Sequence, residues 1–291
     1  MSATAFVGLG AMGLPMATNL AAAISNQPLI IYNRSRAKSD TLASAAPPGA
    51  VKAAATLQEV AGAASIVHLM LADDSACDAV ITELLKGSQG GGDGAHLAAG
   101  SVIVNHSTVH PGCSKRAAAA AEEAGVEYVA APVFGRPDAA AARKLLVVPA
   151  GPPAVLRRVA AHLEALGRVL PPVGEDASKA NVLKLTGNFM IAGAIEMISE
   201  ALAVSEKHGV PGDSILGFIE AFFPAPPIVV GAERFGGGGE GGRRGALVAS
   251  SGASVPSASP QAPATACDAQ CAARPSFKGA ALMTSQTNPE F

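Results

Sequence analysis

The chain has 291 residues, with 21 basic and 23 acidic side chains and a formal net charge of −2 at pH 7. This length suggests one large or two modest domains, and the absence of a basic excess excludes a chain built to neutralise nucleic-acid phosphates. Hydrophobic residues make up 49% of the sequence, which is enough for a buried core and excludes disorder of the whole chain. Four cysteines are too few for a disulfide framework at this length, which favours an intracellular protein.

The apolar first 24 residues do not have the features of a targeting signal. The first positively charged side chain of the sequence is Arg34, which follows this stretch, whereas a secretory signal has a basic region ahead of its apolar stretch. The rest of the sequence has no run of about 18 apolar residues free of glycine and proline, so no membrane span is expected. We therefore expect a cytoplasmic protein.

In chain order, the first 170 residues alternate short apolar runs with Ala- and Leu-rich segments of helical pattern. The runs predict strands over residues 3–8, 29–32, 66–71, 101–105, 128–131, 145–149 and 168–170. The intervening segments predict helices over residues 14–24, 35–46, 75–86, 113–124 and 154–166. Such alternation is typical of βαβ units on a largely parallel sheet, so an α/β fold is expected, with a doubly wound Rossmann-type domain over residues 1–174.

The pattern changes after this domain. Residues 176–207 predict one long helix that ends at His208-Gly209, and residues 213–222 predict a shorter one. We expect these helices to begin an all-helical second domain over residues 175–230, which is incomplete. Residues 231–291 are rich in Gly, Ser, Pro and Ala, and they predict a disordered tail because they bury too little apolar surface to offset the entropy of ordering.

A glycine-rich segment follows the first predicted strand and opens the first predicted helix. It reads Gly8-Leu9-Gly10-Ala11-Met12-Gly13 and has the spacing of a dinucleotide-binding fingerprint. In such a site the first glycine allows a tight turn, the second lets the backbone approach a pyrophosphate, and the third permits close packing of helix on strand. The alternative is a glycine-rich turn that binds nothing.

The end of the second predicted strand favours NADP over NAD. An NAD site usually has Asp or Glu at this place to hold the ribose 2′-hydroxyl, whereas this chain has Asn33. No carboxylate therefore repels a 2′-phosphate, Arg34 can pair with that phosphate, and Ser35 can donate a hydrogen bond to it. The alternative is a solvated arginine at the end of a strand.

Four segments, taken in order, resemble the β-hydroxyacid dehydrogenase family, which includes relatives of 3-hydroxyisobutyrate dehydrogenase and of the NADP-binding domain of 6-phosphogluconate dehydrogenase. They are residues 8–20 (GLGAMGLPMATNL), 69–75 (LMLADDS), 131–144 (APVFGRPDAAAARK) and 184–188 (KLTGN). The resemblance spans residues 3 to 230. It implies a Rossmann domain followed by an all-helical domain, with hydride transfer between NADP and a small β-hydroxy acid or a semialdehyde- or glyoxylate-like carbonyl.

The resemblance makes Lys184 and Asn188 the catalytic candidates. They are four residues apart, so they lie on one side of a helix. An ammonium can stabilise the charge that develops on a carbonyl oxygen and deliver a proton to it, and a neutral amide can orient the substrate hydroxyl. An imine-reducing relative need not keep a lysine here. Without the resemblance, a lysine on a long helix is usually a solvated residue.

The resemblance also assigns roles to three loops. Leu71, Ala72 and Asp73 match a loop near the nicotinamide ribose, and Ser107 matches a serine that contacts substrate or nicotinamide. For Asp73 and Ser107 the alternative role is that of a helix N-cap. The neighbouring His106 has no matched role and is expected to be structural.

The third loop departs from the family. Relatives commonly have Val-Ser-Gly-Gly here, where backbone N–H groups hold a substrate carboxylate, whereas this chain has Phe134 for the serine and Arg136 for the second glycine. Gly135 can still offer its N–H group, and Arg136 could add a guanidinium. We therefore expect Gly135 and Arg136 to bind substrate, and substrate identity cannot be transferred from the relatives.

The C-terminal region departs further. The family's helical domain continues for several helices and includes a Lys-Asp pair, whereas this chain has its low-complexity stretch. This departure weakens the expectation of a homodimer. It also leaves two alternatives open: the protein binds NADP without catalysis, or the unusual C-terminus reflects how the chain was defined. Cys267 and Cys271 lack the further ligands that zinc needs, so no metal is expected.

Overall fold

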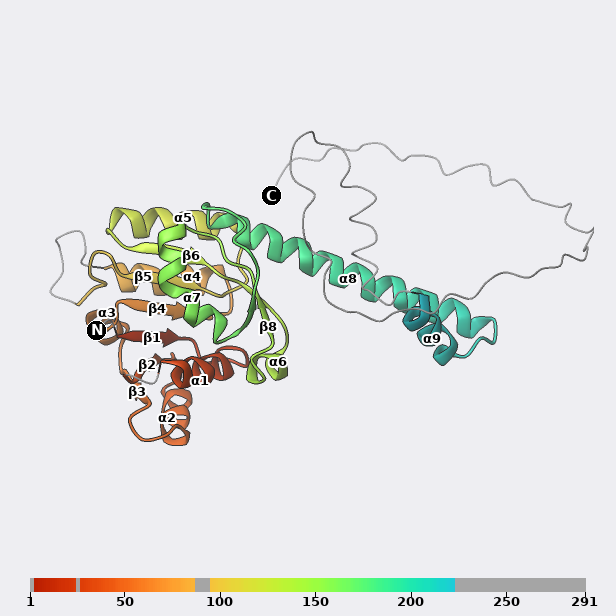
Figure 1. Ribbon diagram of the computed structural model, residues 1–291, viewed down its shortest axis with the longest axis horizontal. Coiled ribbons are helices and arrows are strands. Elements are labelled where there is room, and N and C mark those ends of the chain that lie inside the picture. Colours follow the sequence, from red (N-terminus) through yellow and green to blue (C-terminus); the bar gives the residue numbers. More distant parts are fainter. Residues whose placement is uncertain (1–2, 25–26, 87–94, 223–291) are drawn as a thin grey trace, which may run out of the picture. The chain divides into compact units, whose positions relative to one another are not determined.

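The structure, a computed structural model, describes residues 3–24, 27–86 and 95–222 (Figure 1). These residues all belong to one compact unit, Met1–Phe235. The predicted tail over residues 231–291, with Cys267 and Cys271, lies outside the described residues.

A parallel sheet of six strands in the order β3-β2-β1-β4-β5-β6 confirms the predicted Rossmann-type α/β fold. Its strands are β1 (Thr4–Val7), β2 (Leu29–Tyr32), β3 (Val51–Ala53), β4 (Ile66–Leu69), β5 (Val102–Asn105) and β6 (Glu127–Ala130). The crossover helices are α1 (Gly13–Ala23), α2 (Arg36–Ala45), α3 (Leu57–Ala63), α4 (Asp74–Leu85) and α5 (Pro111–Glu123). The strand order reverses between β1 and β4, and open sheets of this type bind ligands at such a point.

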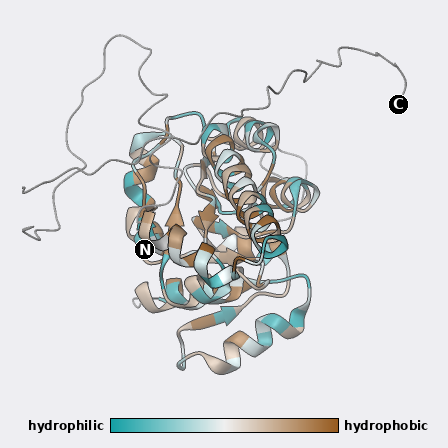
Figure 2. Ribbon diagram, turned by 90° about the vertical axis from the view of Figure 1, so that its right-hand side faces the viewer, coloured by the Kyte–Doolittle hydropathy of each residue, from teal (hydrophilic) through white to brown (hydrophobic). Residues whose placement is uncertain are grey.

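Both faces of this sheet are buried. Successive side chains of a strand point to opposite faces, so neighbouring residues belong to different core clusters. On β1, Ala5 and Val7 belong to the core cluster that also holds side chains of α3, α4 and α5. Phe6, between them, belongs to the cluster formed with α1 and α7. The strands accordingly appear mostly hydrophobic in Figure 2. Two covered faces explain why the strands have continuous apolar sequences rather than an alternation of apolar and polar residues.

The segment β3–α3 was missed by the sequence prediction. Its strand has three residues and its helix seven, which is too short for a periodic pattern to be recognised. One local signal was present, because Thr56 and Glu59 have the spacing of a capping box. Thr56 Oγ1 accepts a hydrogen bond from Glu59 N at 3.1 Å, and Glu59 Oε2 accepts one from Ala55 N at 2.8 Å.

The last two strands of the Rossmann region belong to a separate, smaller sheet, so their placement in one largely parallel sheet was wrong. This sheet has the order β7-β8-β9, with β7 antiparallel to β8. Its elements are β7 (Val133–Phe134), α6 (Pro137–Ala141), β8 (Leu145–Val147), α7 (Pro153–Glu164) and β9 (Gly167–Val169). The physical reason is Pro132, which follows β6 and lacks the N–H group that would continue the ladder. An isolated bridge between Ala130 and Ala150 joins the two sheets.

The predicted long helix is α8 (Ser178–Lys207), followed by α9 (Gly212–Phe222). Its predicted end is confirmed: His208 is the C-cap residue, and Gly209 has a φ of +75°. Its buried residues lie in its first two turns, which pack against α5 and β6. By length and composition α8 could also cross a membrane, which the sequence analysis did not anticipate. The absence of a membrane span therefore stays a prediction.

Candidate nucleotide and catalytic site

The turn between β1 and α1 is closed by its first and third glycines. Gly8 has a φ of +97°, and a Cβ atom there would overlap the carbonyl oxygen of Met70. A Cβ atom at Gly13 would overlap the carbonyl oxygen of Gly8. At Gly10, in contrast, a Cβ atom would meet nothing within 4 Å. The turn is therefore tight at both ends and open in the middle, which is the arrangement that lets a pyrophosphate approach the backbone and the start of a helix.

Asn33 connects this turn to the end of β2. Its Oδ1 accepts a hydrogen bond from Leu9 N at 2.9 Å, and its Nδ2 donates one to the carbonyl oxygen of Ser35 at 3.0 Å. The side chain of Leu9 is buried in the core, so this residue reaches the site through its backbone. A neutral amide thus stands where an NAD site usually has a carboxylate.

A pocket of about 780 Å³ opens above the turn, within the range of cofactor sites. It is lined by residues that the sequence assigned to the cofactor, namely Gly8, Gly10, Ala11, Met12, Gly13, Asn33, Arg34, Ser35, Leu71, Ala72 and Asp73. The structure therefore brings together three segments that are far apart in the sequence. Within the described chain, Lys184, Asn188, Ser107, Gly135 and Arg136 do not line this pocket.

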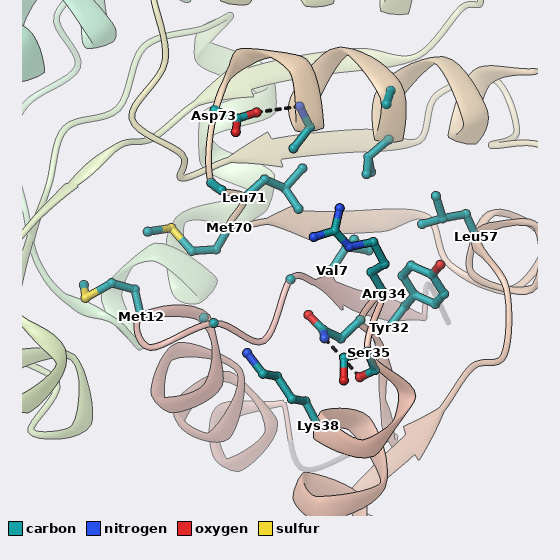
Figure 3. Close-up of a pocket in the computed structure, with 18 of the residues that line it drawn as sticks. Val7, Met12, Tyr32, Arg34, Ser35, Lys38, Leu57, Met70, Leu71 and Asp73 are labelled. Carbon is teal, nitrogen blue, oxygen red and sulfur yellow. Dashed lines mark hydrogen bonds between the residues drawn. The ribbon is translucent and has the colours of Figure 1, made fainter.

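Two cationic side chains, Arg34 and Lys38, line the pocket. Arg34 extends from the end of β2 into the pocket, and Lys38 extends from α2 toward the glycine-rich turn (Figure 3). Ser35 lies between them in sequence and is exposed, and its side chain makes no capping hydrogen bond to α2. Lys38 was missed because a lysine in the first turns of a helix is usually solvated.

The loop after β4 forms a hydrogen bond with the side chain of Ser107. Leu71 N donates a hydrogen bond to Ser107 Oγ at 2.8 Å, and Ser107 is fully buried. Asp73 lines the pocket and is also the N-cap of α4, where its carboxylate accepts a hydrogen bond from Ala76 N at 2.8 Å. Capping was the alternative role considered for Asp73, and the structure shows it together with the pocket position.

A buried polar network extends from Ser107 to α8. The backbone N–H of Ser107 donates to Asn105 Oδ1 at 2.9 Å, and its carbonyl oxygen accepts from Asn181 Nδ2 at 3.5 Å. Asn181 Oδ1 in turn accepts from Ser114 Oγ at 2.7 Å. Asn105 also donates to the Tyr128 hydroxyl at 3.1 Å. This network was missed because its members are isolated polar residues that meet only in the folded chain.

Lys184 lies one turn beyond Asn181 on α8 and is 7% exposed. Burial lowers the pKa of its ammonium from the ordinary value of 10.5. Among the described residues it has no salt bridge, and its Nζ lies 3.8 Å from the ring centroid of Phe134. Asn188, the other catalytic candidate, is exposed. The polar network thus connects the nucleotide loop to the helix that carries a buried, unpaired lysine.

The loop that begins at Phe134 and continues through Gly135 and Arg136 lies next to this lysine. Phe134 is the last residue of β7, Gly135 has a φ of +138°, and Arg136 is exposed at the N-cap position of α6. Gly135 and Arg136 are therefore adjacent in sequence to the ring that contacts Lys184.

His106 lies in a buried chain of three histidines. Its Nδ1 is 2.8 Å from the carbonyl oxygen of Ala131, and its Nε2 is 3.0 Å from His68 Nδ1. His68 Nε2 is 3.1 Å from His162 Nδ1 on α7. Burial lowers the pKa of His106 from 6.5 to about 4, and it lowers the pKa of His68 and His162 as well. His106 therefore contributes to the core, as expected.

The fold and the pocket define a dinucleotide-binding protein of the Rossmann type, with its glycine-rich turn at the switch point of the sheet. Comparison with known proteins agrees with this. Residues 3–187 match the family model described as the NAD binding domain of 6-phosphogluconate dehydrogenase. The chain belongs to this family, among the β-hydroxyacid dehydrogenases, and is an NAD(P)-dependent oxidoreductase acting on CH–OH groups.

Two curated relatives illustrate the similarity. The chain is 35% identical over 222 residues to the uncharacterized oxidoreductase YfjR of Bacillus subtilis, covering 76% of this chain and 73% of the relative. It is 33% identical over 204 residues to the 2-hydroxy-3-oxopropionate reductase of Escherichia coli, covering 70% of this chain and 65% of the relative.

Solved structures give the same fold. The 3-hydroxyisobutyrate dehydrogenase of Mycobacterium tuberculosis, solved with L-serine, superposes with a TM-score of 0.67 at 25% identity, covering 76% of this chain and 70% of that one. An imine reductase from Aspergillus terreus superposes with a TM-score of 0.66 at 23% identity, covering 79% of this chain and 75% of that one. At this lower identity the likeness concerns the fold alone.

Proposed function

We propose that the protein transfers hydride between NADP(H) and a small β-hydroxy acid, or the corresponding semialdehyde- or glyoxylate-like carbonyl. The observation that carries this proposal is the buried Lys184, which has no carboxylate partner among the described residues and lies on a helix linked to the nucleotide loop through Asn181 and Ser107. The names of relatives support the substrate class, since they include a 2-hydroxy-3-oxopropionate reductase and a glyoxylate/succinic semialdehyde reductase.

The preference for NADP rests on the pocket. Relatives include an NAD-dependent L-serine dehydrogenase, and structural neighbours include a reductive aminase with NADPH, so similarity does not decide between the nucleotides. Arg34 and Lys38 offer two positive charges in the lining of the pocket, and Asn33 adds no negative charge. A 2′-phosphate would be stabilised by both cations.

The chemistry assigned to the chain is a proton transfer. A bound nicotinamide would supply or accept the hydride at carbon. Lys184, as the ammonium, would stabilise the negative charge that develops on the carbonyl oxygen and deliver a proton to it, and the neutral amine would accept that proton in the reverse direction. Burial brings the pKa of Lys184 closer to neutral pH, which favours exchange of a proton in both directions. Asn188, on the same side of α8, would orient the substrate hydroxyl. Gly135 and Arg136 would contribute to holding the substrate, and the buried Ser107 would act by holding the nucleotide loop through Leu71 N.

Replacement of Lys184 tests this function. In the Lys184→Ala variant we expect carbonyl reduction to fall by about 10³-fold or more while the NADPH dissociation constant stays unchanged, because the lysine acts only on the substrate oxygen. NADPH fluorescence titration and NADPH oxidation with a panel of small carbonyls measure the two quantities. Lys207→Ala, an exposed lysine on the same helix, is the matched control and is expected to retain activity.

The non-catalytic NADP-binding protein that the sequence left open disagrees with the family, whose curated relatives are named as oxidoreductases. On α8 the side chain of Asn188 and most side chains after it are exposed. If the unmodified protein binds NADPH but reduces no carbonyl in the panel, the proposed substrate class is wrong.

The homodimer expected from the sequence is also a proposal. It is supported by large apolar side chains exposed on α8, among them Phe189, Ile191, Ile195 and Met197. Light scattering of the intact protein would measure its mass in solution, and a monomer would contradict the proposal.

A further inference from the structure

The ring of Phe134 is packed directly on the proposed catalytic lysine. Lys184 Nζ lies 3.8 Å from the ring centroid, which is a cation–π contact. Phe134 is partly buried against the core, so its ring is not a freely moving surface group.

Gly187 provides the space for this ring. It lies three residues after Lys184 on α8, and hence on the same side of the helix. A Cβ atom at Gly187 would overlap Phe134 Cζ and come within 2.8 Å of Phe134 Cε1. Glycine is unfavourable inside a helix, so the close approach of the ring gives a physical reason for its presence.

The ring acts on the ammonium in two ways. It removes water from one side of Nζ, which disfavours the charge, and its negative face attracts the charge. The attraction holds Nζ against the ring, and the N–H groups of Lys184 can then point away from Phe134. The same short segment continues into Gly135 and Arg136, which the proposed function assigns to substrate binding. The position of the lysine is thereby linked to the substrate loop.

We propose that Phe134 is a positioning residue that fixes Lys184 Nζ for proton transfer, and that Gly187 is its steric counterpart on α8. This inference rests on the proposed function for its catalytic consequence. The contact itself can be tested without turnover, which keeps a failure of the inference separate from a failure of the proposed function.

The first test measures the titration of Lys184 directly. An amine-reactive acylating reagent is applied over a range of pH, and the modification of the Lys184 peptide is followed by mass spectrometry. Phe134→Leu keeps the apolar bulk but loses the negative ring face, so the pKa of Lys184 should fall by roughly half a unit to one unit. Phe134→Tyr keeps the ring and should retain the titration of the unmodified protein. An unchanged titration in Phe134→Leu would overturn the inference.

The second test uses the steric pair. Gly187→Ala should displace the ring and lower the rate of reduction at saturating substrate by roughly three- to tenfold, with NADPH affinity retained. In the Phe134→Leu background the same change should add little, because the ring is absent. Additive losses would show that the two residues act independently and would overturn the inference. Gly193→Ala is the matched control, since a Cβ atom there meets nothing within 4 Å.

If the unmodified protein reduces no carbonyl, the proposed function fails, but the lysine titration in Phe134→Leu and Phe134→Tyr still decides the inference. Thermal unfolding of each variant would show whether it is folded.

Discussion

Asn33 and Arg34 are neighbours in sequence with different tasks at the nucleotide pocket. The amide of Asn33 is occupied on both sides by backbone groups of Leu9 and Ser35. Arg34 is exposed and extends into the pocket. The structure therefore separates the residue that holds the glycine-rich turn from the residue that is available for a phosphate.

This separation predicts the effect of removing the arginine. Arg34→Ala should weaken NADPH binding by roughly ten- to a hundredfold and leave NADH binding nearly unchanged, because a charge-assisted hydrogen bond to a phosphate is lost. Fluorescence titration with both nucleotides measures the ratio. Lys52→Ala, an exposed lysine on β3 outside the pocket, is the control. Equal weakening of both nucleotides would contradict the assignment of Arg34 to the 2′-phosphate.

A second prediction at this scale concerns the pH dependence of reduction. Lys184 must be protonated to deliver a proton, and burial lowers its pKa below 10.5. The rate of carbonyl reduction should therefore fall as the pH rises through this lowered pKa. Lys184→Arg, which stays charged, should lose this alkaline limb in a profile of kcat/KM against pH. Persistence of the limb in that variant would assign it to another group.

At the scale of elements, the two buried histidines His68 and His106 and the half-buried His162 connect β4, the end of β5 and α7. Phe6 of β1 stacks on His68, with 6.1 Å between ring centroids. The chain of hydrogen bonds ends on the carbonyl oxygen of Ala131. This arrangement is satisfied by neutral rings, so protonation has to break it or place a charge in the core.

Acid should therefore destabilise the fold in a defined window. The pKa of His106 is lowered from 6.5 to about 4, so the unfolded chain binds a proton more readily than the folded one. The associated stability is present above pH 6.5 and is lost as the pH falls toward 4, by a few kcal/mol. Urea unfolding across this range would measure the slope of the free energy of unfolding.

The variant His106→Gln should reduce this slope but not abolish it, because the pKa values of His68 and His162 are also lowered by burial. His96→Gln, a change at an exposed histidine, should keep the slope of the unmodified protein. A steep slope that survives in His106→Gln would show that other groups cause the acid sensitivity.

The elements that were predicted correctly are those with local signals. The glycine spacing after β1, the apolar runs of the long crossover units and the His208-Gly209 stop of α8 are each contained in a few consecutive residues. The small sheet was not predictable in this way, because β7 has two residues and its pairing with β8 depends on chain beyond α6. The contacts of Asn181, Lys38 and Phe134 likewise depend on tertiary packing. The local sequence around a polar or aromatic residue does not indicate which distant residue it will contact.

At the scale of the whole molecule, binding of the nucleotide should stabilise the fold. The pocket is formed by the ends of β1, β2 and β4, so a ligand there binds the folded chain and not the unfolded one. NADPH at about 100 times its dissociation constant should raise the free energy of unfolding by about 2.7 kcal/mol. At the same concentration NADH should raise it less. Thermal unfolding with each nucleotide measures both effects, and equal shifts would contradict the preference for NADPH.

The hydrogen bonds at Ser107 have a consequence for how the two parts of the site communicate. One group of this residue, its hydroxyl, holds the nucleotide loop, and another, its carbonyl, contacts the start of α8. Thermodynamic linkage is reciprocal, so if nucleotide binding stabilises the contact of Ser107 with α8, a ligand that stabilises the same contact tightens nucleotide binding by the same factor. A substrate held by Lys184 would then lower the dissociation constant of the cofactor, and this one buried serine would carry the coupling.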